Sequence, residues 1–143
     1  MDNTPQKLEN KIAHLNFKDL FPEQIYETLI ELGRTLPSLP PTEQSEERRV
    51  IGCQSQMFLL CRKEGDKLFF TIASDALISK GIGALLVLIY SGESAETILK
   101  YPPAFLAEMG ITTNLSPGRS NGLASLYLKM KQEAVASIMR AQK

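Results

Sequence analysis

This chain has no tryptophan, only one histidine and no excess of either charge. Its 16 basic and 16 acidic side chains balance, which argues against a nucleic-acid or membrane-surface protein, because those carry a basic excess or a basic stripe. The most apolar stretch, residues 82–90, is far shorter than the about 20 residues that a membrane-spanning helix needs. The polar first residues lack the apolar core of a signal peptide. We therefore expect a cytoplasmic protein without membrane or nucleic-acid partners.

Metal ligands and catalytic bases are also scarce. A zinc or iron–sulfur site needs three or four Cys, His or carboxylate ligands held together, and the chain offers Cys53, Cys61 and His14 without a CxxC pair. If the residues between the two cysteines form a strand, the thiols lie about 20 Å apart, too far for a disulfide. A cysteine or serine hydrolase needs a histidine base, and His14 is remote in the sequence. We predict free thiols, no metal, no resident cofactor and no autonomous enzyme.

The composition is that of a globular protein. Of the 143 residues, 43% are apolar and 22% are charged, which excludes a disordered chain and allows one domain, residues 1–143, with a hydrophobic core. A helix is expected from Pro22 to about Gly33, with a weaker one at residues 6–15 before it. The proline-rich segment 37–49 is expected to be a loop.

Strand patterns follow this loop. Residues 55–63 and 67–74 form a predicted β-hairpin around Gly65, and Arg49–Ile51 is a candidate third strand. Helical patterns then return, and we predict that Ser74 or Asp75 caps the first of these helices. The expected helices cover residues 76–91, with Gly81 and Gly83 packed closely on the sheet, then 95–101, opened by Ser94, then 102–110, and a long helix from Pro117 capped by Ser116. Apolar residues at spacings of three and four give this last helix one apolar face. This order predicts an α+β fold, with a small antiparallel sheet of about three strands covered on one face by helices.

Cys53 occupies an unusual position, on a polar turn directly before an apolar run, in the stretch RRVIGCQSQMFLL. The preceding Gly52 permits backbone angles that other residues resist, so the turn can present or retract the thiol. Arg48 and Arg49 are the nearest basic residues, and positive charge favours the reactive thiolate. Exchange at sulfur needs only a thiolate and access. On these grounds alone, a thiol acceptor or redox carrier and a plain structural cysteine both remain open.

Four segments in the same order resemble the SufE/CsdE family. They are LIELGRTLP at 29–37, VIGCQSQMFLL at 50–60, ASDALISKGIGALLVLIYSG at 73–92 and LSPGRSNGL at 115–123, so the similarity spans about residues 20–140 and leaves 1–19 poorly matched. The resemblance implies a fold like that of the scaffold IscU. It also implies a sulfur acceptor that takes persulfide sulfur on Cys53 from a PLP-dependent cysteine desulfurase of the SufS/CsdA type. The acceptor would stimulate that enzyme and deliver sulfur to scaffolds of iron–sulfur cluster assembly.

The resemblance also assigns roles to individual positions. Cys53 would carry the persulfide, with Gly52, Gln54 and Ser55 as its loop. Asp75 would either contact this loop or cap the following helix. Two residues at the start of the last helix, Arg119 and Asn121, would contact an anion or partner or serve in local capping. The resemblance assigns no role to Cys61, which we expect to be a buried strand residue. Many relatives have tryptophan where this chain has Phe58.

Two alternatives accompany the carrier hypothesis. A regulatory module would dock on a desulfurase without accepting sulfur, and its stimulation would survive Cys53→Ser, whereas that of a carrier would be lost. An autonomous thiol enzyme would turn over a small substrate without any partner protein.

Overall fold

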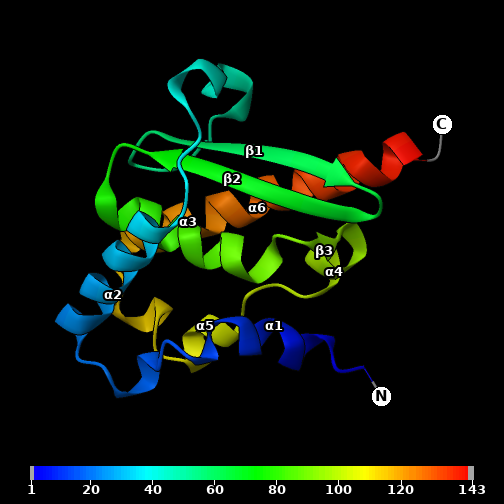
Figure 1. Cartoon of the computed structure of the whole chain (residues 1–143). Helices are drawn as coiled ribbons and strands as arrows, with labels where there is room; N and C mark the ends of the chain where they lie inside the picture. The colour runs from blue at the N-terminus through cyan, green and yellow to red at the C-terminus, as the bar shows by residue number, and fades with distance from the viewer. Residues whose placement is uncertain (1, 142–143) are drawn as a thin grey trace.

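The computed structural model describes residues 2–141. Its helices and strands, in chain order, are α1 Thr4–Ala13, α2 Pro22–Thr35, β1 Met57–Glu64, β2 Lys67–Ser74, α3 Leu77–Tyr90, β3 Glu93–Ser94, α4 Ala95–Lys100, α5 Phe105–Glu108 and α6 Pro117–Ala141 (Figure 1). Single 3-10 turns occur at Phe17–Asp19, Pro41–Glu43, Glu46–Arg48 and Thr112–Asn114. The α+β class and the predicted hairpin are therefore confirmed.

The sheet has the strand order β1-β2-β3 and is antiparallel throughout. The hairpin pairs Met57 with Ser74 at one end and Glu64 with Lys67 at the other. The prediction of a third strand at Arg49–Ile51 was wrong, because β3 pairs with the opposite edge of the hairpin and Arg49 makes only one bridge, to Phe58. The physical reason is Gly52, whose φ of 93° turns the chain away directly after Ile51 and stops further pairing.

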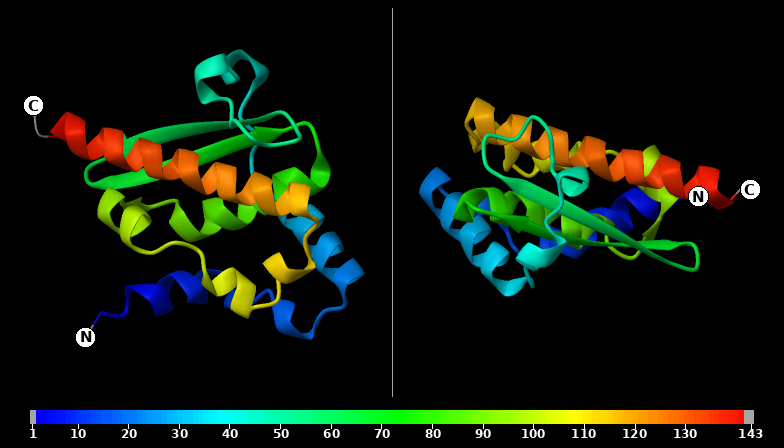
Figure 2. Two further views of the ribbon diagram at one scale, coloured as in Figure 1. Left: turned by 180° about the vertical axis from the view of Figure 1, so that it is seen from behind. Right: turned by 90° about the horizontal axis from the view of Figure 1, so that it is seen from above.

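Helices α3 and α6 cover one face of the sheet, and α2 packs on α3 (Figures 1 and 2). Alternate strand residues point into this layer, as the pleat of a strand requires, and the buried ones are Met57, Leu59, Leu68, Phe70 and Ile72. Helix α3 is buried almost all round, because α1 and α2 contact it in addition to the sheet and α6. It is the centre of the hydrophobic core, which agrees with its apolar composition.

Glycines allow two close approaches of α3. A Cβ on Gly81 would lie 2.0 Å from the backbone oxygen of Leu29, so this glycine lets α2 cross α3. A Cβ on Gly83 would lie 2.5 Å from a methyl carbon of Ile72 on β2. The prediction that both glycines pack on the sheet is therefore confirmed for Gly83 and wrong for Gly81. Close helix–helix contact, which the sequence pattern did not distinguish from helix–sheet contact, explains the difference.

The N-terminal segment is anchored by an ion-pair cluster. Leu8 and Ile12 of α1 are buried in the core, while Lys7 and Lys11 both bind the carboxylate of Glu93, which is only 5% exposed. The Lys11 ammonium also donates to the backbone oxygen of Ile89 at 2.8 Å. The weakly predicted first helix is therefore confirmed and docked against the rest of the fold. Within residues 2–141, no helix combines the length and the apolar character needed to cross a membrane.

Three predicted helix caps have different outcomes. The Ser94 hydroxyl accepts from the Thr97 N–H at 3.2 Å and caps α4 as predicted. Ser116 accepts from the Arg119 N–H at 3.4 Å, directly before Pro117 opens α6, so this cap is also confirmed. The predicted cap of α3 by Ser74 or Asp75 was wrong, because Ala76 occupies the N-cap position without a side-chain bond and Asp75 is engaged elsewhere.

Candidate functional site

Cys53 lies on a closed loop between the end of the proline-rich segment and β1. The Val50 N–H donates to the Met57 oxygen at 2.8 Å, and the Arg49–Phe58 bridge lies next to it. These contacts close the base of the loop formed by residues 51–56. At Gly52 the backbone has positive φ, and a Cβ there would lie 2.6 Å from the Ser125 hydroxyl of α6. Both the turn and the close approach to α6 therefore require glycine at this position.

Two sets of polar contacts hold the loop against the start of α3. The Asp75 N–H donates to the Gln56 oxygen at 3.1 Å, and the Asp75 carboxylate accepts from the Gln56 N–H at 3.0 Å. One residue earlier in the loop, the Ser55 hydroxyl hydrogen-bonds to that of Ser79, at 2.7 Å. Ser79 is 9% exposed, so Ser55 supplies the partner that a buried hydroxyl needs.

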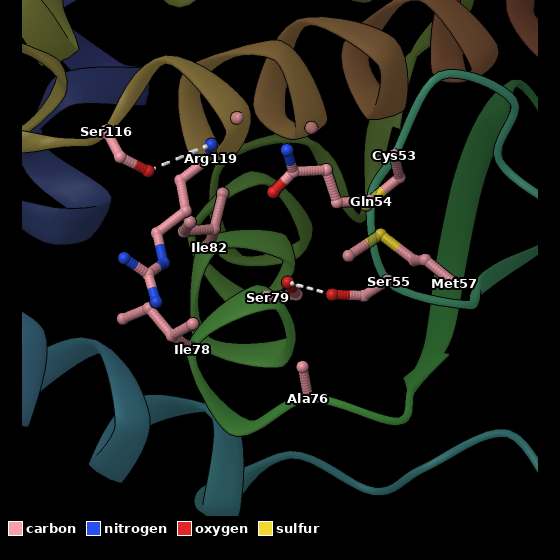
Figure 3. A pocket seen from close by; sticks show the side chains of 12 residues that line it. Cys53, Gln54, Ser55, Met57, Ala76, Ile78, Ser79, Ile82, Ser116 and Arg119 are labelled. Atoms are coloured by element: carbon pink, nitrogen blue, oxygen red, sulfur yellow. Dashed lines mark hydrogen bonds between the residues drawn. The ribbon is translucent and has the colours of Figure 1, made fainter.

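The thiol of Cys53 is free and half-buried, and it packs at the edge of the hydrophobic core. It borders a pocket of about 230 Å³ between the loop, the first turns of α3 and the start of α6 (Figure 3). The residues around this pocket combine apolar groups with hydroxyl, amide and guanidinium groups, and they are Cys53, Gln54, Ser55, Met57, Ala76, Ile78, Ser79, Ile82, Ser116, Gly118, Arg119 and Gly122. Figure 3 shows Arg119 and Ile78 on the side opposite Cys53.

The structure brings together most of the residues predicted for the site. Cys53, Gln54, Ser55 and Arg119 all border the pocket. The Arg119 guanidinium lies 5.2 Å from the centre of the Tyr26 ring, in cation–π geometry, and this contact fixes its direction.

Three other predicted residues lie outside the pocket lining. Gly52 shapes the loop from its exposed side, and Asp75 holds the loop through Gln56. Of the two roles considered for Asp75, the loop contact is the one that the structure contains. Asn121 is exposed on the first turns of α6 and does not border the pocket.

Sequence reasoning missed several pocket residues. Ser79 is a small polar residue in the first turns of α3, and Gly118 and Gly122 are four residues apart on α6. A spacing of four places both glycines on one face of the helix. This pattern indicates that another segment of the chain approaches that face closely. The sequence alone did not say that the cysteine loop would be the segment that approaches.

The other candidate ligands and nucleophiles lie away from this pocket. His14 is exposed at the end of α1, and residues 2–141 contain no group of three or more His, Cys, Asp or Glu side chains arranged to hold a metal ion. Cys61 lies on β1 as predicted but is half-buried rather than buried, because the hairpin extends beyond the densest part of the core there. Burial and the nearby Glu133 carboxylate raise the pKa of the Cys61 thiol to about 11, although the Arg140 guanidinium opposes the shift.

Comparison with known proteins places this geometry in a family. Residues 12–134 match the family model SufE, described as an Fe-S metabolism associated domain. The chain belongs to the SufE family. Family membership gives it a role in iron–sulfur metabolism, and the predicted resemblance is confirmed. The matched region also begins within the N-terminal segment that sequence reasoning had left poorly matched.

Individual relatives agree with this assignment. An uncharacterized SufE-like protein of Rhizobium meliloti is 36% identical over 117 residues, which cover 78% of this chain and 84% of the relative. The SufE-like protein 1, chloroplastic/mitochondrial, of Arabidopsis thaliana is 31% identical over 94% of this chain but only 36% of its own length. The solution structure of a hypothetical protein from Thermus thermophilus superposes with a TM-score of 0.74 at 28% identity, covering 90% of this chain and 96% of that one.

Proposed function

We propose that this protein is a sulfur carrier, in which Cys53 accepts sulfane sulfur from a PLP-dependent cysteine desulfurase and delivers it for iron–sulfur cluster assembly. The position of Cys53 is the observation that supports this proposal most strongly. Its thiol is half-buried beside a pocket, on a loop that hydrogen bonds of Ser55 and Gln56 hold in place. A carrier needs a thiol that is sheltered between transfers and reachable by a docked partner. A short loop that is closed at its base and attached to the start of α3 by polar contacts provides both conditions.

The transfer is an exchange at sulfur. The Cys53 thiolate attacks the terminal sulfur of the persulfide on the desulfurase, the sulfur–sulfur bond in that persulfide breaks, and the desulfurase cysteine leaves as a thiolate. Cys53 then carries the persulfide, and no net oxidation or reduction occurs. A second exchange of the same kind passes the sulfur to the next acceptor. Neither step needs a histidine base, and none of the residues that border the pocket is a histidine.

The residues around Cys53 favour a carrier over a cluster scaffold. A scaffold must hold iron through several thiolate, imidazole or carboxylate ligands. The pocket lining contains one thiol, several hydroxyls, one amide and one guanidinium, and the last three kinds of group are poor ligands for iron. The same lining suits a single sulfur atom that is stored and passed on.

The alanine that a cysteine desulfurase releases from L-cysteine provides the test. The wild-type chain is expected to raise the rate of alanine release, and Cys53→Ser is expected to abolish the stimulation while binding to the desulfurase persists. Cys61→Ser is the matched control, because it removes the other thiol, and it should stimulate like the wild type. Stimulation that survives Cys53→Ser would instead support the docking regulator and reject the carrier.

A further inference from the structure

The sulfur of Cys53 lies against a glycine of α6. A Cβ built on Gly122 would lie 3.3 Å from the Cys53 sulfur, which is closer than the optimal distance of about 3.5–4.0 Å between non-bonded heavy atoms. Apart from the two residues next to Gly122 in the chain and the backbone of the same helix, no other atom in the described structure lies within 4 Å of that position. Glycine within a helix is destabilising relative to alanine. The absence of a side chain at Gly122 therefore makes room for one neighbour, the Cys53 sulfur.

A second glycine, one turn earlier on α6, provides a contrast. A Cβ on Gly118 would lie 2.4 Å from the side-chain oxygen of Gln54, and its three nearest neighbours are all atoms of that amide. The loop therefore approaches α6 at two adjacent turns, with a flexible amide at one and the thiol at the other. Gln54 is exposed and can move aside, whereas the thiol is half-buried.

We propose that Gly122 is a positioning residue for sulfur transfer: its bare backbone makes room for the Cys53 sulfur and lets the terminal sulfur of the persulfide enter the pocket, away from small thiols. This inference rests on the proposed function. The terminal sulfur extends only about 2.05 Å from the first, and the pocket next to Gly122 holds about 230 Å³. Ser79 and Ile82 of α3 border the same pocket and would enclose this atom.

The reaction that this placement prevents is attack by a small thiol in solution. A glutathione thiolate that reaches the terminal sulfur forms a new sulfur–sulfur bond to it, and the bond to Cys53 breaks. Glutathione leaves with the sulfur as its own persulfide, and Cys53 returns to a thiolate. A methyl group at position 122 would shift the Cys53 sulfur outward by a few tenths of an ångström and would fill part of the space for the terminal sulfur, so this loss would become faster.

The experiment loads sulfur without a desulfurase. Sodium tetrasulfide converts the Cys53 thiolate to a persulfide and is itself shortened to a trisulfide ion. All variants carry Cys61→Ser, so that Cys53 is the only thiol. The lifetime of the persulfide in glutathione is then followed by intact-mass spectrometry for the reference protein, for Gly122→Ala and for Ala124→Ser, the control, which adds one atom at an exposed position of α6 outside the pocket lining. We expect Gly122→Ala to shorten the lifetime by about tenfold, and Ala124→Ser to change it by less than about twofold.

Thermal unfolding of the unmodified protein gives a second, independent measurement. In a Cys53→Ala background, Gly122→Ala should raise the melting temperature by about 3 °C, because alanine favours the helix over glycine and the tight contact with the sulfur is absent. With Cys53 present, the same change should raise it by less, or lower it. Equal shifts in the two backgrounds would overturn the proposed contact.

The outcomes separate this inference from the proposed function. Equal persulfide lifetimes for Gly122→Ala and the reference protein would overturn the positioning role. So would a reference protein that takes up no sulfur from tetrasulfide, or one that loses it as fast as the unfolded chain does. If Gly122 protects a chemically loaded persulfide but no desulfurase delivers sulfur to Cys53, the positioning role stands and the proposed function fails.

Discussion

Asp75 and Gln56 are joined by two hydrogen bonds, one from the Asp75 N–H to the Gln56 oxygen at 3.1 Å and one from the Gln56 N–H to the Asp75 carboxylate at 3.0 Å. Asp75 lies in the turn between β2 and α3, and Gln56 ends the cysteine loop. The backbone bond survives any substitution that keeps the turn, whereas the carboxylate bond depends on the side chain. Asp75 is therefore the residue at which the closure of the loop can be altered without changing the thiol or its pocket.

Replacing Asp75 with alanine should loosen the cysteine loop. Loss of this exposed hydrogen bond weakens closure by about 1 kcal/mol, which corresponds to an about fivefold larger population of the open loop. The rate of Cys53 alkylation by iodoacetamide, followed by peptide mass spectrometry, should rise by this factor. Asp66→Ala, an exposed change in the turn at the far end of the hairpin, should leave the rate unchanged. An Asp75 variant that reacts at the wild-type rate would contradict this role.

The hydroxyl pair of Ser55 and Ser79 should behave as one unit. Ser79→Ala removes a partner that Ser55 meets at 2.7 Å, and each single alanine variant should lose about 1 kcal/mol of stability. The double variant should lose less than the sum of the two, with a coupling of about 0.5–1.5 kcal/mol in urea unfolding. Ser55→Ala combined with Asp66→Ala, an exposed change in the turn at the far end of the hairpin, provides the additive control. Additive losses for Ser55 and Ser79 would show that the pair contributes nothing.

The cluster around Glu93 should make stability depend on acid pH. Burial alone raises the pKa of this carboxyl, but hydrogen bonds and charge from Lys11 and Lys7 outweigh it and bring the pKa below the ordinary value of 4.5. The folded state therefore holds the proton less tightly than the unfolded chain does. The stabilisation is fully present above about pH 4.5 and is lost as the pH falls through the lower folded-state pKa.

The corresponding variant is Glu93→Gln, which leaves Lys11 beside a neutral amide. Its free energy of unfolding at pH 7 should be about 2 kcal/mol lower than that of the wild type. The loss is smaller than for a fully buried ion pair, because Lys7 is largely exposed. Urea unfolding should show that the difference in unfolding free energy between wild type and variant is smaller at pH 3 than at pH 7. Glu96→Gln, on the exposed side of α4, should have little effect at either pH. A gap that is the same at both pH values would refute the role of the ionised cluster.

Cys61 should react slowly and in a strongly pH-dependent manner. With a pKa of about 11, caused by burial and by Glu133, its thiolate is scarce at neutral pH, and its alkylation should accelerate by about tenfold per pH unit up to that value. Glu133→Gln should speed the reaction at pH 8, because it removes a negative charge, and Arg140→Gln should slow it, because it removes the opposing positive one. Peptide mapping after a short iodoacetamide pulse distinguishes Cys61 from Cys53. Two variants with the same rate would contradict this electrostatic explanation.

Local patterns were sufficient to predict most of the fold. The hairpin around Gly65, the helix caps at Ser94 and Ser116 and the apolar face of α6 all depend on residues that are close together in the sequence. The third strand was misplaced because β3 has only two residues, too few for a recognisable alternation, and because it pairs with β2 after a whole helix intervenes. Pairing at that separation is decided by how α3 packs on the sheet.

The site was predictable in its centre but not in its surroundings. The glycine–cysteine motif located the thiol and its loop, and the polar residues at the start of α6 indicated Arg119. The contacts that hold the loop join residues 19 and 24 positions apart, Gln56 with Asp75 and Ser55 with Ser79, and no local pattern predicts them. The approach of Gly122 to the thiol likewise depends on where α6 crosses the sheet.

The most direct test of the carrier is intact-mass spectrometry of the chain after incubation with a cysteine desulfurase, PLP and L-cysteine. We expect a gain of about 32 Da for one sulfur atom, which reductant reverses and which occurs in Cys61→Ser but not in Cys53→Ser. No gain in the presence of a desulfurase that demonstrably binds the chain would contradict it.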